Sequence, residues 1–301
     1  MTRTEQFEAQ RPMLTALCYR MLGERALAED AVQDTWLKWS TADHSTIRTP
    51  AAWLRTAATR VAIDSLRRAK ARRETYVGPW LPEPLIVDET TAEDSFALAQ
   101  DCELALLWIM DTLPASERAA FVLREAFDAS YADIADTLGK SEAACRQLVS
   151  RAHRRIAQSA PDLTQPPGKR AAQISGFLAA IASNDLDTAK AYLATDAISI
   201  SDGGAKARAA RRPLIGPEDI VLVSHAVTLK HAAGLAPVPV TANRHPALLM
   251  MEDGRAHTLF TAALDATGKI CWMYTMRNPD KMPLRDSGGG HMRSTSSAQR
   301  T

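Results

Sequence analysis

Two proline-rich breaks limit the fold of this 301-residue chain more than any other feature of its sequence. The first contains GPWLPEPLIV (78–87) and the second contains PDLTQPPGKR (161–170). Proline lacks a backbone N–H and its ring obstructs a continuing helix, so no helix or central strand is expected to run through either segment. We therefore predict separate domains joined by linkers rather than one continuous core.

The sequence before the second break has helical periodicity. Residues 1–75 alternate helical patterns with short polar breaks and contain no strand-like alternation. Thr91 and Asp94 form a capping-box pattern, which indicates the start of a second helical block running to about residue 158. Both blocks are predicted to be all-helical.

Strand-like runs occur only after the second break. One amphipathic helix is expected over residues 171–194, followed by apolar runs with turn signals between them. Helix followed by strands predicts an α+β domain with a curved antiparallel sheet over about residues 170–283, and the low-complexity tail at 284–301 is expected to be disordered. The strand-like runs are AISIS, VPVTA, ALLMM, AHTLFTAAL and KICWMYTM, with turns at EDG and ATG.

Composition excludes several classes of protein. The 36 Lys and Arg nearly balance the 35 Asp and Glu, so the distribution of charge must indicate partners. The four cysteines are far apart without a CxxC pair, which favours buried, reduced thiols over a disulfide framework or a zinc site. No segment resembles a signal peptide or a membrane span, and we expect a cytoplasmic protein without a metal or cofactor.

The stretch YADIADTLGKSEAACRQLVSRAHRRIA (131–157) predicts a helix-turn-helix. Gly139 permits the left-handed turn and Ser141 can cap the second helix. That helix would bury Ala144, Leu148, Ala152 and Ile156 and direct its arginines outward. Residues 140–155 contain five basic residues and one acidic residue, which suits a helix that enters the major groove of DNA. An ordinary solvated cationic helix is the alternative.

A second basic tract favours the interpretation as a DNA-binding protein. Residues 54–73 contain seven basic residues and one acid, with Trp36, Trp39 and Trp53 nearby. Cations beside aromatic rings suit unstacked single-strand bases, although tryptophans at helical spacing are more often core residues, as we expect for Trp36 and Trp53. Between the two tracts, residues 74–117 contain ten acidic residues and no Lys or Arg, which indicates either an acidic tether with its own role or a merely solvated spacer.

Three segments in this order resemble an extracytoplasmic-function (ECF) sigma factor of bacterial RNA polymerase. They are YRMLGERALAEDAVQDTWLKW and TPAAWLRTAATRVAIDSLRRAKARRE, which resemble region 2, and LPASERAAFVLREAFDASYADIADTLGKSEAACRQLVSRAHRRI, which resembles region 4. The motifs WLPEP (80–84), DGGAK (202–206) and NPDKM (278–282) resemble the sigma-J-like subgroup with a fused SnoaL-like domain.

The resemblance implies a multidomain protein with two all-α sigma domains and an α+β cone of the SnoaL and nuclear transport factor 2 type. The implied domains are region 2 at 1–75, an acidic WLPEP linker at 76–100, the region 4 helix-turn-helix at 101–160, the SnoaL-like regulatory domain at 170–283, and the tail. A one-component repressor is a weaker alternative, since it would need no helix for binding polymerase.

The resemblance also implies roles for individual residues. Region 2 would bind the polymerase β′ subunit and the melted −10 element, with the loop from Ser40 to Pro50 taking a flipped base. Region 4 would recognise the −35 element as duplex. The expected polymerase-binding residues are Gln33 and Asp34, and the expected DNA-binding residues are Lys38, Arg60, Asp64, Arg67, Arg68, Arg146, Gln147, Ser150, Arg151 and Arg154.

By the same resemblance, the C-terminal domain contacts the linker and replaces a separate anti-sigma protein. Polymerase core, through its β and β′ subunits, and promoter DNA are the expected partners, and a small ligand in the C-terminal cavity stays an open alternative. An isomerase or ligand sensor fused to a DNA-binding region is the competing hypothesis, with Tyr192, Asp202, His225, His245 and His257 as candidates that form no evident constellation. The expected linker-contact residues are Trp80, Leu81, Pro82, Glu83, Pro84, Asp202, Gly203, Gly204, Lys206, Asn278, Pro279, Asp280 and Lys281.

Overall fold

The chain forms two compact units. A computed structural model describes residues 2–87, 102–159, 167–231, 234–282, 284–285 and 292–293. The helical unit comprises residues 1–75 and 91–159, and the C-terminal unit comprises residues 76–90 and 160–301. The first proline-rich segment therefore belongs to the C-terminal unit, although more than seventy residues of chain separate the two in sequence. We call its described part, residues 76–87, the linker segment.

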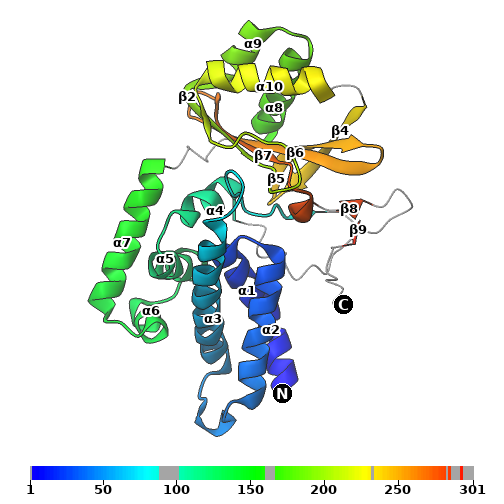
Figure 1. Cartoon of the computed structure of the whole chain (residues 1–301). Coiled ribbons are helices and arrows are strands. Elements are labelled where there is room, and N and C mark those ends of the chain that lie inside the picture. The colour runs from blue at the N-terminus through cyan, green and yellow to red at the C-terminus, as the bar shows by residue number, and fades with distance from the viewer. Residues whose placement is uncertain are drawn as a thin grey trace. The chain divides into compact units, whose positions relative to one another are not determined.

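The first part of the helical unit is a bundle of three helices, drawn from blue to cyan in Figure 1. Gly23, with φ of 72°, ends the first helix, and Trp39 is fully buried among the three. Trp36 and Trp53 are half-buried, so they are less completely part of the core than we expected. The prediction of an all-helical block is confirmed. The elements are α1 (Arg3–Leu22), α2 (Arg25–Thr41), the short 3-10 turn η1 (His44–Thr46) and α3 (Pro50–Arg73).

The second part of the helical unit contains the predicted helix-turn-helix. Ser130 forms a capping box at the start of α6, Gly139 provides the left-handed turn with φ of 64°, and the hydroxyl of Ser141 accepts a hydrogen bond from the amide of Ala144 at 3.2 Å. The predicted helix start at Thr91 and Asp94 lies outside the described residues. The elements are α4 (Leu104–Asp111), α5 (Ala115–Phe127), α6 (Tyr131–Leu138) and α7 (Glu142–Ser159).

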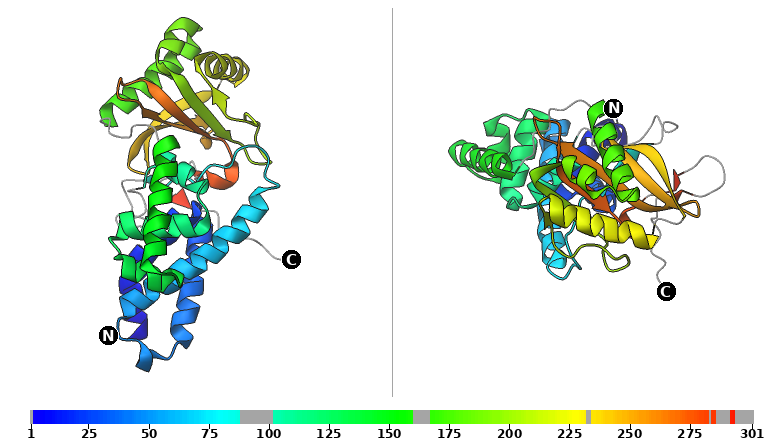
Figure 2. Two further views of the ribbon diagram at one scale, coloured as in Figure 1. Left: turned by 90° about the vertical axis from the view of Figure 1, so that its left-hand side faces the viewer. Right: turned by 90° about the horizontal axis from the view of Figure 1, so that it is seen from above.

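The C-terminal unit is a bent sheet with helices on one face (Figures 1 and 2). Its strand order is β1-β4-β5-β6-β7-β2-β3, and β1 is supplied by the linker segment. A separate pair, β8 (Leu284–Arg285) with β9 (Met292–Arg293), lies in the tail predicted to be disordered, most of which is outside the described residues. The other elements are α8 (Pro167–Ala182), α9 (Leu186–Ala191), β1 (Ile86–Val87), β2 (Leu193–Asp202), β3 (Leu214–Ile215), α10 (Pro217–His231), β4 (Leu235–Ala242), β5 (His245–Glu252), β6 (Arg255–Leu264), β7 (Ile270–Met276) and the 3-10 turn η2 (Pro279–Lys281).

Two expectations for this unit were wrong in detail, and one helix was missed. The sheet is mixed. Strands β4, β5, β6 and β7 pair antiparallel in that order, whereas β7 pairs with β2 in parallel. The single helix predicted over 171–194 is two helices, since Asn184 has φ of 60° and Asp185 caps α9. The helix α10 was not predicted, although Pro217 at its first turn, followed by Glu218 and Asp219, is a helix-start signal.

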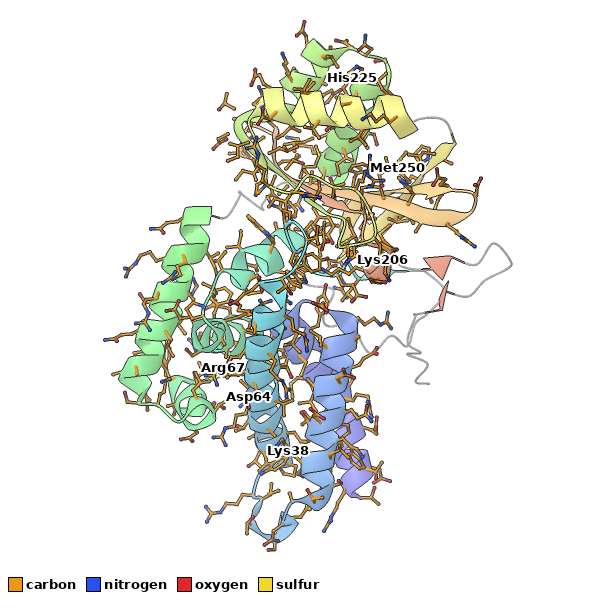
Figure 3. The ribbon with its side chains drawn as sticks, in the orientation of Figure 1. Lys38, Asp64, Arg67, Lys206, His225 and Met250 are labelled. Carbon is orange, nitrogen blue, oxygen red and sulfur yellow. The ribbon has the colours of Figure 1, made fainter. Side chains whose placement is uncertain are left out.

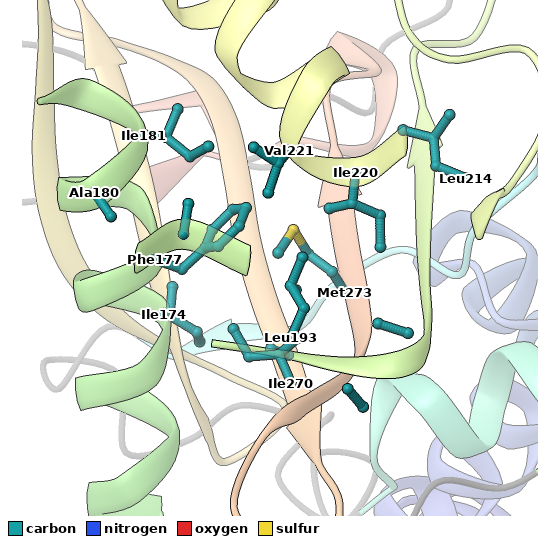
Figure 4. Close-up of a cluster of buried hydrophobic side chains, with 14 of the residues drawn as sticks. Ile174, Phe177, Ala180, Ile181, Leu193, Leu214, Ile220, Val221, Ile270 and Met273 are labelled. Atoms are coloured by element: carbon teal, nitrogen blue, oxygen red, sulfur yellow. The ribbon is translucent and has the colours of Figure 1, made fainter. Parts of the chain in front are cut away.

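Apolar side chains from both layers form the core of the C-terminal unit (Figure 4). Phe177 of α8 and Val221 of α10 are each 1% exposed, and they pack in one cluster with Met273 of β7. Burying one such side chain contributes about 1.5–3 kcal/mol. This shared core fixes the position of the sheet. The sheet in turn positions the end of β2 and the segment after β7, which contact the linker segment.

The expected burial of the cysteines is observed for three of the four. Cys18, Cys102 and Cys145 are buried, Cys271 is partly buried, and none of them forms a disulfide. Burial raises the pKa of the Cys18 thiol to about 12. None of the helices in the described ranges combines the length and the hydropathy that a membrane span requires.

Candidate nucleic-acid and linker interfaces

The solvent face of α7 presents the residues predicted to recognise duplex DNA. Arg146, Gln147, Ser150, Arg151 and Arg154 are all exposed. The buried face consists of Cys145, Leu148, Val149 and Ala152, while Ala144 and Ile156 are only half-buried. The expected stripe was therefore shifted by one residue, because α7 packs against both α5 and α6.

A buried carboxylate positions part of this face. The Nε atom of Arg151 donates to Oε1 of Glu117 at 2.8 Å, and Arg155 forms an ion pair with the same carboxylate at 3.3 Å. The Glu117 side chain is only 6% exposed, whereas that of Arg151 is 44% exposed. Sequence analysis missed Glu117, and its separation of 34 residues from Arg151 gives no local signal.

Arg146 is restrained by two contacts within the helix-turn-helix. It donates to Glu142 at 2.8 Å, and its guanidinium lies 5.0 Å from the ring centre of Tyr131. These contacts hold one cation near the N-terminal half of α7, the part of a recognition helix that approaches base edges.

The exposed residues of α2 and α3 form the second candidate surface (Figure 3). Gln33, Asp34 and Lys38 lie exposed on α2. On α3, Arg67 and Asp64 form a surface ion pair at 3.4 Å, and Arg68 donates to Ser65 at 3.1 Å. A pair this exposed contributes little to stability, so its charges are available to a ligand.

The loop expected to take a flipped base is ordered by local hydrogen bonds. The Asp43 carboxylate accepts from the hydroxyl of Ser45 at 2.6 Å and from its amide at 3.0 Å, and these bonds lower the pKa of Asp43. A ring nitrogen of His44 lies 2.9 Å from the carbonyl oxygen of Trp39. The loop therefore has a defined turn at η1.

Arg60 contacts the helix-turn-helix. Its Nε donates to the carbonyl of Thr137 and its Nη2 donates to the carbonyl of Asp136, both at 3.0 Å. The hydroxyls of Thr56 and Thr137 are 3.1 Å apart. A cation at the C-terminal end of α6 is favourable because the last carbonyls of a helix lack intrahelical donors. Arg60 thus joins α3 to α6.

The linker segment binds the C-terminal domain through a buried carboxylate, Asp202, at the end of β2. One carboxylate oxygen of Asp202 accepts from the hydroxyl of Tyr76 at 2.6 Å and from the amide of Gly204 at 2.9 Å. The other accepts from the amide of Leu81 at 3.0 Å and from Nζ of Lys281 at 2.8 Å. Asp202 is fully buried, and four donors satisfy it.

Lys281 completes this contact. Its Nζ donates to the carbonyl of Leu81 at 2.7 Å and lies 4.4 Å from the ring centre of Trp80 and 5.2 Å from that of Tyr76. Its side chain is 7% exposed. A buried ammonium needs such compensation, here from a carboxylate, a carbonyl and two aromatic faces. We call Asp202, Lys281, Tyr76, Trp80 and Leu81 the linker clamp.

Further contacts hold the rest of the linker segment. The Tyr274 hydroxyl donates to the carbonyl of Pro82 at 2.6 Å. The amide of Leu85 donates to the side chain of Asn243 at 2.9 Å, and the amide of Asn243 donates back to the carbonyl of Leu85 at 2.9 Å. Leu81, Pro82, Pro84 and Leu85 are buried, whereas Glu83 is half-buried.

Both glycines of the DGGAK motif are required by close packing. A Cβ atom on Gly203 would clash with the carbonyl oxygen of Ala207. On Gly204, which has φ of 55°, it would lie 2.7 Å from the Asn278 side chain. Asn278 in turn donates to the Tyr76 hydroxyl at 2.7 Å. The glycines let this loop approach the NPDKM segment.

Lys206, Pro279 and Asp280 were predicted to contact the linker, but all three lie exposed on the surface. Lys206 forms an ion pair with Asp280 in which both side chains are more than 60% exposed. Lys281, and not Lys206, occupies the buried position, because η2 directs it toward Asp202. Sequence analysis missed Tyr76, Tyr274 and Asn243, which belong to none of the recognised motifs.

The isomerase candidates contact different partners. Asp202 is part of the linker clamp, and a ring nitrogen of His245 lies 3.1 Å from Arg170, where burial and that cation lower the pKa of His245 to about 4. His257 contacts Arg277 at 3.2 Å, and the Tyr192 ring packs closely against Gly176. Asp202, His245 and His257 therefore each contact a different group within the described part of the C-terminal unit.

Comparison with known families accounts for this pair of basic surfaces. Residues 6–72 match the family described as Sigma-70 region 2, and residues 103–156 match the family described as Sigma-70, region 4. A chain with both regions is a promoter-specific transcription initiation factor of the sigma-70 class, and such factors bind core RNA polymerase and promoter DNA.

Whole-chain relatives narrow the assignment. The chain is 36% identical over 295 residues to the ECF RNA polymerase sigma factor SigJ of Mycobacterium tuberculosis (strain ATCC 25618 / H37Rv), covering 93% of this chain and 94% of that protein. It is 29% identical over 287 residues to the probable ECF RNA polymerase sigma factor SigI of M. tuberculosis (strain CDC 1551 / Oshkosh), covering 94% and 96%. A crystal structure of M. tuberculosis SigJ matches with a TM-score of 0.74 and 33% identity, over 92% of this chain and 97% of that one. The chain therefore belongs to the ECF RNA polymerase sigma factor family.

Proposed function

We propose that this ECF sigma factor reads the melted −10 element with α2 and α3, reads the −35 duplex with α7, and is regulated in the cytoplasm by its own C-terminal domain. The observation that supports regulation is the linker clamp. In it, the buried ion pair of Asp202 and Lys281 forms hydrogen bonds with both the amide and the carbonyl of Leu81. The segment that connects regions 2 and 4 is thereby bound to a third domain of the same chain. This tethered contact takes the place of a separate anti-sigma protein.

The functional assay is transcription with purified core polymerase. The full chain is expected to associate with core polymerase in mild salt and to start transcription at specific promoters, whereas an isomerase fused to a DNA-binding region would do neither. Gln147→Ala is expected to relax selectivity at one −35 base pair by about 1–3 kcal/mol, because a bidentate amide contact to adenine is lost. Gln158→Ala, an exposed glutamine at the far end of α7, is the matched control and should leave selectivity unchanged. Equal promoter preference in both variants would exclude α7 as the reading helix.

The contact between α3 and α6 is expected to be present in a resting state and broken in a promoter-bound state. Arg60 and Thr137 are joined at 3.0 Å, which holds the two DNA-reading parts of the helical unit together. Sites near −10 and −35 are about two helical turns, or ~70 Å, apart on DNA. Both sites cannot be occupied while this hydrogen bond persists. We infer that α3 and α6 separate when the factor binds polymerase and promoter.

A disulfide between α3 and α6 is expected to block initiation. Thr56→Cys combined with Thr137→Cys places two thiols where hydroxyls now lie 3.1 Å apart, close enough for a bond after small adjustment. Promoter-dependent transcription should fall at least about tenfold in the oxidised form and recover on reduction, while each single variant stays active under both conditions. Full activity of the oxidised double variant, with the disulfide verified by mass spectrometry, would show that the contact need not open.

A further inference from the structure

The solvent face of α10 is apolar, which is unusual for a helix that already buries its opposite face. Among the large apolar side chains that are exposed in the described part of the chain, four of six lie in this region. Leu229 is 72% exposed and Leu222 is 66% exposed, while Ile220 and Val221 of the same helix are fully buried. The exposed members of this region are Ile215, Leu222, Val227 and Leu229.

Leu222 and Leu229 form one stripe along the helix together with the exposed Ala226. Leu222, Ala226 and Leu229 follow the spacing i, i+4, i+7, so they lie on the same face over two turns. All three are exposed, whereas Ile220 and Val221 of the same helix are buried against the core. Ala226, at the middle of the stripe, is small and would let a second helix approach closely, near the lower end of the usual 8–10 Å between helix axes.

The charges beside the stripe are complementary for an antiparallel pair. Asp219 lies in the first turn of α10 and Lys230 lies in the last, both at exposed or half-exposed positions. They are eleven residues apart, which is three helical turns, so they flank the stripe on the same side. In an antiparallel pair of identical helices, residues on the same flank face each other, and Asp219 of one copy would lie near Lys230 of the other. Among the described residues of one chain, Asp219 forms a long surface ion pair with Arg212 at 3.8 Å.

We propose that α10 is a self-association surface that pairs with α10 of a second copy about a twofold axis near Ala226. The axis places Leu222 of each copy against Leu229 of the other, because the sum of paired residue numbers is constant in an antiparallel pair, and it brings Asp219 to within two residues of the position opposite Lys230. Such an isologous contact satisfies both copies at once and leaves no open end. The stripe together with Ile215 would bury on the order of 800 Å² in total, which is below the range of stable specific interfaces and in that of weak, transient contacts. The dimer is therefore weak and reversible, with a Kd on the order of 10–100 µM.

Sedimentation equilibrium of the full chain tests the proposal. The wild type should shift from monomer to dimer as its concentration rises through this range, and Leu222→Glu should weaken the association at least about tenfold. The matched control is Leu37→Glu, which alters an equally exposed leucine of the helical unit, at 56% exposed, and should not change the association. A wild type that stays monomeric up to several hundred micromolar, or equal weakening by both variants, would overturn the proposal.

Cross-linking and charge reversal test the antiparallel geometry. A mixture of Leu222→Cys and Leu229→Cys proteins should form a disulfide-linked dimer faster than either protein alone. Asp219→Lys and Lys230→Glu should each weaken association, and the double variant should restore it, because both partners then carry exchanged charges. Restoration is the readout that a simple loss of stability would not produce. The antiparallel pair would be contradicted if the Leu222→Cys protein alone formed disulfide-linked dimers fastest. It would also be contradicted if the double charge variant associated more weakly than both single variants.

Discussion

Lys281→Met is expected to destabilise the C-terminal unit by about 3–5 kcal/mol and to release the linker segment. The side chain of methionine fills most of the space of the lysine stem but carries no charge. Asp202 would keep its hydrogen bonds to Tyr76, Leu81 and Gly204, yet its carboxylate is fully buried and would lose the one cation that pairs with it in the described part of the chain. Leaving a buried charge uncompensated costs far more than the net contribution of the intact pair.

The matched control is Lys206→Met, which removes the other lysine of the same two motifs. Lys206 and Asp280 are more than 60% exposed, so water replaces the lost partner and the expected effect is at most about 1 kcal/mol. Chemical denaturation of the full chain measures both changes. Similar small effects for the two lysines would mean that Asp202 finds another partner and that the clamp contributes little.

Hydrogen exchange locates the effect within the linker segment. The amides of Leu81 and Leu85 are both bonded to side chains of the C-terminal domain, at 3.0 and 2.9 Å, and should exchange slowly in the wild type. In Lys281→Met, exchange across residues 76–87 should accelerate, and promoter-dependent transcription should change with it. Accelerated exchange with unchanged transcription would refute regulation through the linker while leaving the clamp itself intact.

Features set by neighbouring residues could be predicted from the sequence. The turn at Gly139, the cap at Ser141 and the exposed arginines of α7 depend on residues within a few positions, and each is observed. The strands β4 to β7 also match their apolar runs, because hairpin partners are adjacent in sequence. Local pattern and local geometry agree in these segments.

Contacts between distant segments could not be predicted in the same way. The parallel pairing of β2 with β7 depends on the path of the whole intervening chain, and the pairing of Arg60 with Thr137 spans 77 residues. The motifs WLPEP, DGGAK and NPDKM indicated which segments of the C-terminal unit meet, but they did not indicate which lysine is buried. That choice depends on η2, whose turn directs Lys281 inward and leaves Asp280 on the surface.

Asp111→Ala is expected to destabilise the helical unit by about 3–5 kcal/mol. One carboxylate oxygen of Asp111 accepts from Arg73 at 2.6 Å and from Arg118 at 3.2 Å. The Arg118 side chain is fully buried and that of Arg73 is 11% exposed. Burial lowers the pKa of Arg118 to about 10, so the guanidinium is still charged at neutral pH and requires a counter-ion.

The same carboxylate joins the two sigma regions within the helical unit. Arg73 ends α3 and also donates to the carbonyl of Leu22, while Arg118 of α5 donates to the carbonyl of Arg20. Removing Asp111 takes away the carboxylate that these two neighbouring cations share, although Arg73 keeps its ion pair with Glu24 at 3.2 Å and Arg118 keeps the carbonyl of Arg20. We therefore expect Asp111→Ala to lower the midpoint of denaturation and to loosen α3 from α5, detected as faster exchange of amides in both helices. Glu8→Gln is the control, since it removes an equally short ion pair, with Arg11 at 2.6 Å, that is exposed on α1 and should cost at most about 1 kcal/mol. Equal effects of the two substitutions would show that burial of Arg118 does not depend on its carboxylate.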